Sequence, residues 1–105
     1  MVDSRTNFKA KIFKALSDPA RLQILDYLRN CEKCECEIVP YLGLKQPAVS
    51  RHLKILTHQG ILNFRKEGVR KMYSISTPKI LEILDLIDDR HLLELKEAAI
   101  RRLEA

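Results

Sequence analysis

The middle of this 105-residue chain constrains the fold more than any other segment. A short helix is expected over Ile38–Leu42, with Pro40 in its first turn. It ends at Gly43-Leu44, since glycine readily takes the left-handed conformation that a tight turn needs. A second helix is expected over Gln46–His58, because apolar residues at helical spacing give it one buried stripe: Val49, Leu53 and Leu56. Two helices joined by such a turn predict a helix-turn-helix.

A β-hairpin is expected directly after this pair of helices. Short strands over Ile61–Lys66 and Lys71–Ile75 flank a turn at Glu67–Arg70. A helix-turn-helix followed by a hairpin is a winged helix-turn-helix, so the predicted fold class is mostly α with a β-hairpin. A generic small bundle with a hairpin is the alternative. It leaves unexplained why both the hairpin tip and the exposed face of the preceding helix are basic.

Further helices are expected on both sides of this unit. Residues 8–16 carry apolar side chains at helical spacing, and the next helix runs over about 19–29 with Asp18 as its cap. Cys31–Glu37 is expected to be a polar break between helices. One long final helix is expected from Lys79 to about Leu103.

Length and composition indicate one winged helix-turn-helix domain over residues 1–105. Apolar residues make up 46% of the chain, which is enough for a core, and no apolar run is long enough to cross a bilayer. The polar, charged start of the chain does not resemble a signal peptide, so a cytoplasmic protein without a membrane partner is expected. The final helix carries more apolar surface than one small domain can bury. This excess predicts a homodimer built by the terminal helices.

Positive charge is concentrated between Lys45 and Lys71. This segment holds seven basic residues and one acidic residue, a net charge of +6, whereas the whole chain has a formal net charge of +5. The segment could simply be a solvated charged face, but a basic patch on an otherwise balanced chain is typical of a protein that binds a polyanion. An α-helix fits the major groove of DNA, where the base edges differ in their donors and acceptors.

The helix over Gln46–His58 supplies the expected base contacts. Arg51 can bind a guanine through two hydrogen bonds, and Gln46 can pair with an adenine. Ser50 and Lys54 can hold phosphates or bases. His52 precedes a buried leucine, so it either contacts the groove or packs inside. Three basic hairpin residues are expected to contact the DNA backbone or the minor groove: Arg65, Arg70 and Lys71.

All three cysteines of the chain fall within six residues: Cys31, Cys34 and Cys36. An odd, tightly clustered set is poor material for a structural disulfide framework. Soft thiolates prefer thiophilic ions, so the three sulfurs could converge on arsenite or supply part of a zinc or cadmium site. A disulfide-forming redox sensor and free surface cysteines are the alternatives. A disulfide-exchange enzyme is disfavoured, because helices flank the cysteines and no β-α-β pattern is present.

The ordered motifs of the chain resemble the ArsR/SmtB family of metal-responsive repressors. The resemblance covers roughly residues 10–103 and is carried by LSDPARLQIL at 16–25, QPAVSRHLKIL at 46–56, and the hairpin motifs GIL at 60–62, RKEG at 65–68 and YSI at 73–75. It implies a homodimer that represses by occupying an operator and releases it when an effector binds. The Cys34-Glu35-Cys36 segment resembles the Cys-x-Cys pair that precedes the short third helix in the arsenic-sensing branch. Val39 stands where a third cysteine can follow in that branch, and Cys31 is present instead.

A second family motif is present only in part. Asp89-x-His91 resembles the first half of the zinc site on the family's final helix, but Arg102 and Ala105 stand where the other two ligands would be. Two ligands hold zinc weakly. His91 is therefore expected at the dimer interface or on the surface.

These observations predict a DNA-binding transcriptional repressor with no enzymatic activity and no obligatory cofactor. Its partners are double-stranded operator DNA and a second copy of the chain. It is expected to release the operator when the cysteine cluster binds a thiophilic ion: arsenite, cadmium or zinc. The same repressor triggered by thiol oxidation is the alternative. A passive metal-binding or protein-interaction module is a third hypothesis, which salt-sensitive binding of duplex DNA would exclude.

Overall fold

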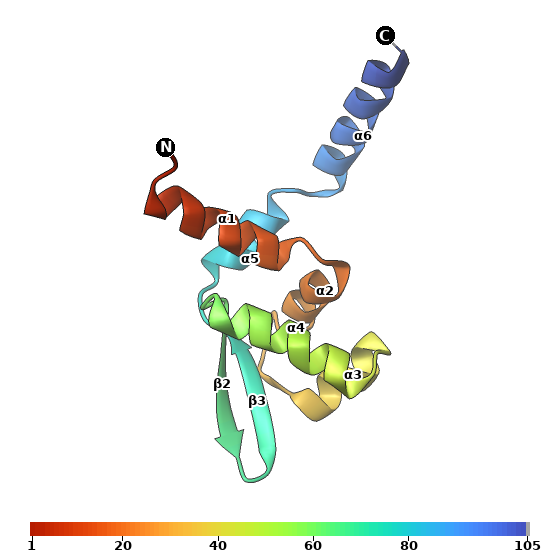
Figure 1. Ribbon diagram of the computed structural model, residues 1–105. Helices are drawn as coiled ribbons and strands as arrows, with labels where there is room; N and C mark the ends of the chain where they lie inside the picture. The colour runs from red at the N-terminus through yellow and green to blue at the C-terminus, as the bar shows by residue number, and fades with distance from the viewer. Residues whose placement is uncertain (105) are drawn as a thin grey trace.

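The computed structural model describes residues 1–104 and arranges them as six helices and three short strands (Figure 1). In chain order the elements are α1 (Ser4–Leu16), α2 (Pro19–Tyr27), β1 (Lys33–Cys34), α3 (Glu35–Leu42), α4 (Gln46–His58), β2 (Leu62–Glu67), β3 (Arg70–Ile75), α5 (Lys79–Asp85) and α6 (Asp89–Glu104). The winged helix-turn-helix expected from the sequence is confirmed, with α3 and α4 as the two helices and β2–β3 as the wing. No helix of the described part is both long enough and apolar enough to span a membrane.

The buried stripe of α4 holds the helix-turn-helix in place. Val49, Leu53 and Leu56 are fully buried in one cluster with Ile24 and Leu25 of α2, as their helical spacing predicted. The turn before α4 uses Gly43 at φ +68°, where its N–H donates to the Val39 carbonyl at 3.1 Å. A left-handed backbone at this position favours glycine, and it closes α3.

The start of α2 also follows the sequence prediction. The Asp18 carboxylate accepts hydrogen bonds from the Ala20 and Arg21 N–H groups at 2.9 and 3.3 Å, and Pro19 occupies the first turn. Both features satisfy backbone groups that a helix start leaves unpaired.

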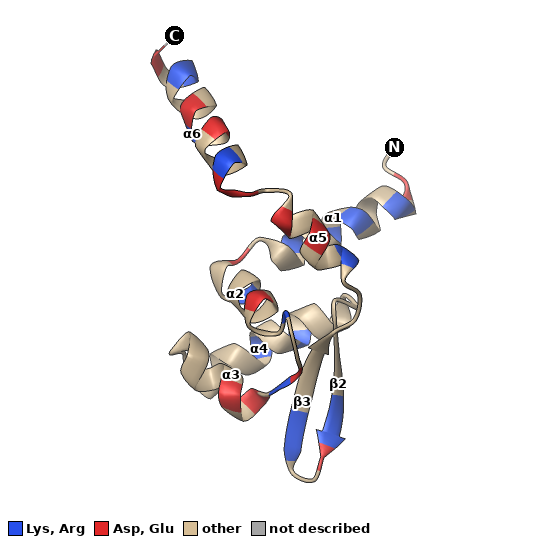
Figure 2. Ribbon diagram, turned by 180° about the vertical axis from the view of Figure 1, so that it is seen from behind, with Lys and Arg blue, Asp and Glu red and all other residues tan. Residues whose placement is uncertain are grey.

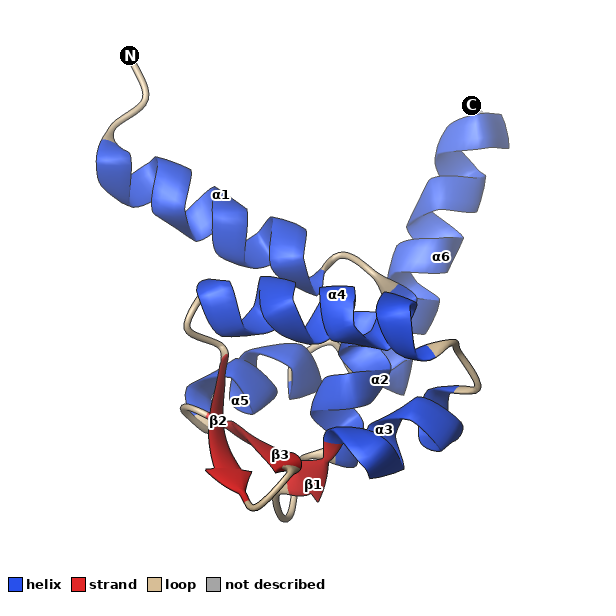
Figure 3. Ribbon diagram, turned by 60° about the horizontal axis from the view of Figure 1, so that its bottom comes forward, coloured by secondary structure: helices blue, strands red, loops and turns tan. Residues whose placement is uncertain are grey.

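The hairpin belongs to a sheet with a third strand that the sequence analysis missed. The strand order is β1-β3-β2, and both pairs are antiparallel. Lys33 and Cys34 pair with Tyr73 and Met72 of β3, so the expected polar break at Cys31–Glu37 is wrong over these two residues (Figure 3). A two-residue strand is too short to show an alternating pattern.

The helix α3 begins three residues earlier than expected. Cys34 is its N-cap: the Cys34 N–H donates to the Glu37 carboxylate and the Cys36 N–H points to the Cys34 sulfur, each at 3.0 Å. Pro40 therefore lies inside the helix rather than in its first turn. It removes one backbone donor from the helix.

The single long helix expected over Lys79–Leu103 is wrong, because the chain forms two helices there. The Asp88 carboxylate accepts from the His91 N–H at 2.9 Å, so Asp88 caps the start of α6. Helix α6 projects from the rest of the molecule (Figure 1 and Figure 2) and has no buried residue. Its apolar residues are exposed: Leu92, Leu93, Leu95, Ile100 and Leu103.

The packing of α4 leads to a stability prediction. Leu53→Ala removes a fully buried side chain and should lower the free energy of unfolding by about 2–5 kcal/mol. Ile55→Ala is the matched control, since Ile55 lies on the same helix with 40% of its surface exposed, and should cost at most about 1 kcal/mol. Urea unfolding of both variants at one protein concentration measures the difference. Equal costs would show that the stripe is not the buried face of α4.

Candidate DNA interface and cysteine site

The outer face of α4 presents polar and basic side chains. Gln46, Arg51 and Lys54 are exposed, and Ser50 is half-buried. Within residues 1–104, Arg51 and Lys54 take part in no ion pair. Of the five α4 side chains expected to contact DNA, these four therefore lie on one accessible side of the helix.

His52 lies on the inner side of the same helix. Its Nδ1 is 3.1 Å from Nη1 of Arg21 and 4.0 Å from the Asp18 carboxylate, and only 19% of its side chain is exposed. Of the two roles that the sequence left open, the structure shows packing against the start of α2. DNA contact by His52 stays a prediction.

The wing carries basic residues next to acidic ones (Figure 2). Arg65 donates to Glu32 at 3.1 Å and lies 2.8 Å from Glu67. Hydrogen bonding by Arg65 lowers the pKa of the Glu32 carboxyl. Lys71 stands over the Phe64 ring, with its ammonium 5.6 Å from the ring centroid.

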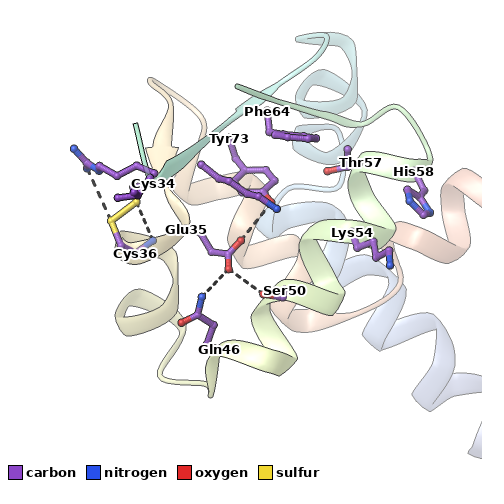
Figure 4. A pocket seen from close by; sticks show the side chains of 13 residues that line it. Cys34, Glu35, Cys36, Gln46, Ser50, Lys54, Thr57, His58, Phe64 and Tyr73 are labelled. Atoms are coloured by element: carbon purple, nitrogen blue, oxygen red, sulfur yellow. Dashed lines mark hydrogen bonds between the residues drawn. A yellow bond between two sulfur atoms is a disulfide. The ribbon is translucent and has the colours of Figure 1, made fainter. Parts of the chain in front are cut away.

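A cleft of about 760 Å³ separates α4 from the wing (Figure 4). Its walls combine residues that the sequence assigned to DNA binding with the residues that begin α3. The lining includes Gln46, Ser50, Lys54, Arg70, Lys71, Cys34 and Cys36. The structure thus brings parts of the two predicted sites into one cleft, whereas Arg51, Arg65 and Cys31 do not line it.

Glu35 is the one carboxylate that lines this cleft, and the sequence analysis assigned it no binding role. Its Oε2 accepts from Gln46 Nε2 at 3.0 Å and from Ser50 Oγ at 2.9 Å, while Oε1 accepts from the Tyr73 hydroxyl at 3.3 Å (Figure 4). Burial of the phenol, together with the negative charge of Glu35, raises the pKa of Tyr73 to about 12. No pattern in the sequence identifies such a residue, since its partners lie 11 to 38 positions away.

The cysteine cluster is only partly assembled. Cys34 and Cys36 are joined by a disulfide with their Cα atoms 5.0 Å apart, whereas Cys31 is free and exposed. Nη2 of Arg70 lies 3.9 Å from the Cys36 sulfur, and Nη2 also lies 3.7 Å from Glu37. Among residues 1–104, no three His, Cys, Asp or Glu side chains are gathered as a metal site. The three predicted ligands are therefore not brought together.

The partial zinc motif lies in the first turn of α6. Asp89 and His91 are both exposed, and Arg102 stands on the last turn of the same helix. Ala105, the other position of the motif, lies outside the described residues.

Comparisons with known proteins agree with this geometry. A family model described as bacterial regulatory protein, arsR family, matches residues 18–63. An uncharacterized HTH-type transcriptional regulator of Methanocaldococcus jannaschii is 44% identical over 76% of this chain and 91% of its own. An arsenical resistance operon repressor of Staphylococcus xylosus is 39% identical over 73% of this chain and 70% of its own. A probable mercury resistance operon repressor of Streptomyces lividans is 35% identical over 73% of this chain and 62% of its own.

Solved structures show the same fold. The crystal structure of Rv0081 from Mycobacterium tuberculosis superposes with a TM-score of 0.79 at 28% identity, covering 94% of this chain and 99% of that one. The solution structure of a homodimeric winged helix-turn-helix DNA-binding domain from Mycobacterium bovis, a possible ArsR-family regulator, gives 0.77 at 28% identity over 88% and 91% of the two chains. This chain belongs to the ArsR family of winged helix-turn-helix transcriptional regulators, which are DNA-binding proteins rather than enzymes.

Proposed function

We propose that this chain is a dimeric repressor that releases its operator when Cys34 and Cys36 bind a thiophilic ion such as arsenite or cadmium. The observation that supports this proposal is the shared cleft. It is lined by the cysteine pair, by the first turn of α4 and by Arg70 of the wing. A change at the cysteines therefore occurs beside the residues that meet DNA. The names of the arsenical and mercury resistance repressors among the relatives favour an ion over oxidation as the trigger.

The DNA contacts follow from the exposed faces. Helix α4 enters the major groove, where Arg51 binds guanine and Gln46 pairs with adenine, while Ser50 and Lys54 hold bases or phosphates. The wing lies along the backbone, where three basic residues contact phosphates: Arg65, Arg70 and Lys71. Arg65 then exchanges its carboxylate partners for phosphate oxygens. We propose that His52 helps to hold α4 against α2, because its ring nitrogen lies 3.1 Å from Arg21 at the start of α2.

The exposed apolar surface supports a homodimer. Phe8 and Phe13 of α1 are each 56% exposed. The leucine and isoleucine side chains of α6 are exposed as well. An apolar groove of about 300 Å³ between α2, α5 and α6 continues this surface. A solved relative with this fold is homodimeric. We therefore propose that residues 1–105 form one DNA-binding domain whose terminal helices join two copies, with their α4 helices about one DNA turn apart, roughly 34 Å.

The donor set fits a thiophilic ion once the disulfide is reduced. Reduction by a cellular dithiol adds two electrons and two protons and leaves the Cys34 and Cys36 thiols, which lose protons when they bind an ion. Cys31 is exposed just before β1, so it is available as a third thiolate if its loop moves toward the pair. Cys34 and Cys36 would hold the ion, which would supply a soft positive centre that thiolates prefer. Ion binding would change the surroundings of Arg70, whose Nη2 lies 3.9 Å from the Cys36 sulfur, and we expect it to move α3 relative to the dimer axis.

The first of three predictions from this proposed function tests the recognition helix. Arg51→Ala should weaken operator binding by about 1–3 kcal/mol, because a guanine contact is lost. Arg70→Ala should weaken operator and random DNA alike and lower the salt dependence by about one phosphate contact. Arg90→Ala on α6 is the matched control. Fluorescence anisotropy at several salt concentrations measures all three variants. The α4 assignment fails if Arg51→Ala binds its operator like the parent.

The second prediction tests the dimer. Sedimentation at micromolar concentration should show a dimer for the parent, and Leu95→Arg should shift it toward monomer and weaken operator binding. Glu94→Arg introduces the same side chain on the polar face of α6 and should stay dimeric. A parent that sediments only as a monomer contradicts the proposed assembly.

The third prediction tests the cysteines under strict reduction. The parent should release operator DNA on addition of arsenite or cadmium, with a coupling of order 1–3 kcal/mol. Cys34→Ser and Cys36→Ser should each keep operator binding and lose this release. Cys31→Ser should lose it too if three thiolates bind, and only weaken it if Cys31 is auxiliary. His91→Ala is the control that should respond like the parent.

Two results would overturn the ion-sensing mechanism. Release of DNA by the ion from the Cys34→Ser/Cys36→Ser double variant would exclude the cysteines as the sensor. A parent that ignores every ion but releases DNA on oxidation would establish thiol oxidation as the trigger instead.

A further inference from the structure

Glu35 connects three elements that meet around the cleft. It occupies the first position of α3, and its carboxylate contacts Gln46 and Ser50 of α4 together with Tyr73 of β3. Hydrogen bonds to a charged group are stronger than neutral ones, and they are directional. The carboxylate therefore holds two side chains of the recognition helix in defined orientations.

These orientations decide which hydrogen-bonding groups face DNA. Gln46 donates one of its two Nε2 hydrogens to Glu35, which leaves one donor and the Oε1 acceptor for a base edge. That remaining pair is the one that adenine matches in the major groove. Ser50 donates its only hydroxyl hydrogen to Glu35, so its oxygen can only accept elsewhere. Without Glu35, the Gln46 amide could rotate and the Ser50 hydroxyl could donate.

Glu35 is also placed directly between the two bonded cysteines. Cys34 pairs with Met72 in the sheet and caps α3, while Cys36 follows Glu35 in the first turn. A change in the 5.0 Å separation between the Cα atoms of Cys34 and Cys36 would move the backbone of Glu35, because Glu35 lies between them in the chain. Its carboxylate therefore links the residue between the two cysteines directly to α4.

We propose that Glu35 is a positioning residue: it sets the base preference of α4 by orienting Gln46 and Ser50, and it transmits changes at Cys34 and Cys36 to the DNA contacts. The role of Glu35 in base preference depends only on its contacts in the ion-free, disulfide-bonded structure. Its role in transmission rests on the ion-sensing function proposed above.

The first experiment uses ion-free, full-length protein, both with the Cys34–Cys36 disulfide that the structure shows and after its reduction. DNA selected from a random pool by the parent is compared with single-base variants of it in competition binding. Glu35→Ala should reduce the discrimination at one position of each half-site by at least about five-fold, since the oriented Gln46 contact is lost. Glu35→Gln keeps an acceptor oxygen and should retain part of the discrimination.

Glu32→Ala is the matched control. Its carboxylate belongs to the same segment but binds Arg65 on the wing, so its loss should change the affinity for all sequences alike. Thermal unfolding of each variant shows whether the fold is kept, and a general loss of stability would not alter one base position selectively. Unchanged discrimination in a folded Glu35→Ala protein overturns the positioning role.

The second experiment adds arsenite and measures two quantities. Ultraviolet absorption of the arsenic–thiolate bonds reports ion binding, and anisotropy reports operator release. Glu35→Ala should bind arsenite with the parent's stoichiometry, while its release of DNA should fall by at least about five-fold from the change expected of the parent, which is of order 5- to 150-fold. Glu32→Ala should release DNA like the parent.

The outcomes separate the two proposals. Equal release by Glu35→Ala and the parent overturns transmission through Glu35 and leaves ion sensing intact. A parent that neither binds nor responds to arsenite overturns arsenite sensing and transmission together, whereas a changed base preference in Glu35→Ala still supports the positioning role.

Discussion

Burial of one stripe of α4 is the constraint on which the rest of the molecule depends. Val49, Leu53 and Leu56 are fully enclosed by α2, α3 and the base of the wing. A helix with three fully buried residues on one side cannot rotate without exposing them, at a cost of about 1.5–3 kcal/mol for each. The opposite face is thereby fixed toward solvent, and Arg51 and Lys54 owe their accessibility to this packing. Asp18 and Gly43 position α2 and the turn against which the stripe packs.

The wing sheet places the cysteines beside this helix. Strand β1 has only two residues, yet its pairing with β3 anchors Cys34 to the wing at the point where α3 begins. The next residue, Glu35, then reaches α4 on one side and Tyr73 on the other. Proximity of the cysteine pair to the residues predicted to contact DNA thus follows from backbone hydrogen bonds. These bonds hold the backbone of Cys34 beside Met72 of β3.

Features that depend on neighbouring residues in the chain could be predicted from the sequence. The stripe of α4, the cap at Asp18 and the turn at Gly43 are each encoded within a few neighbouring residues, and all three were confirmed. The break between α5 and α6 was missed, because a periodic apolar pattern continues through it and only the Asp88 cap reveals it. Strand β1 and the contacts of Glu35 depend on residues far away in the chain. Periodicity and spacing carry no signal for such pairs.

Residues 31–37 contain three carboxylates, and each of them contacts a residue that is expected to bind DNA. Glu32 binds Arg65, Glu35 holds Gln46 and Ser50, and Glu37 lies 3.7 Å from Arg70. These two ion pairs are exposed and weakened by solvent, so DNA phosphates could displace the carboxylates at low cost. Glu35 differs because its partners lie on α4 and in the core of the wing. Phosphate could replace Glu32 and Glu37 as partners of Arg65 and Arg70, but losing Glu35 would free the orientation of the helix side chains themselves.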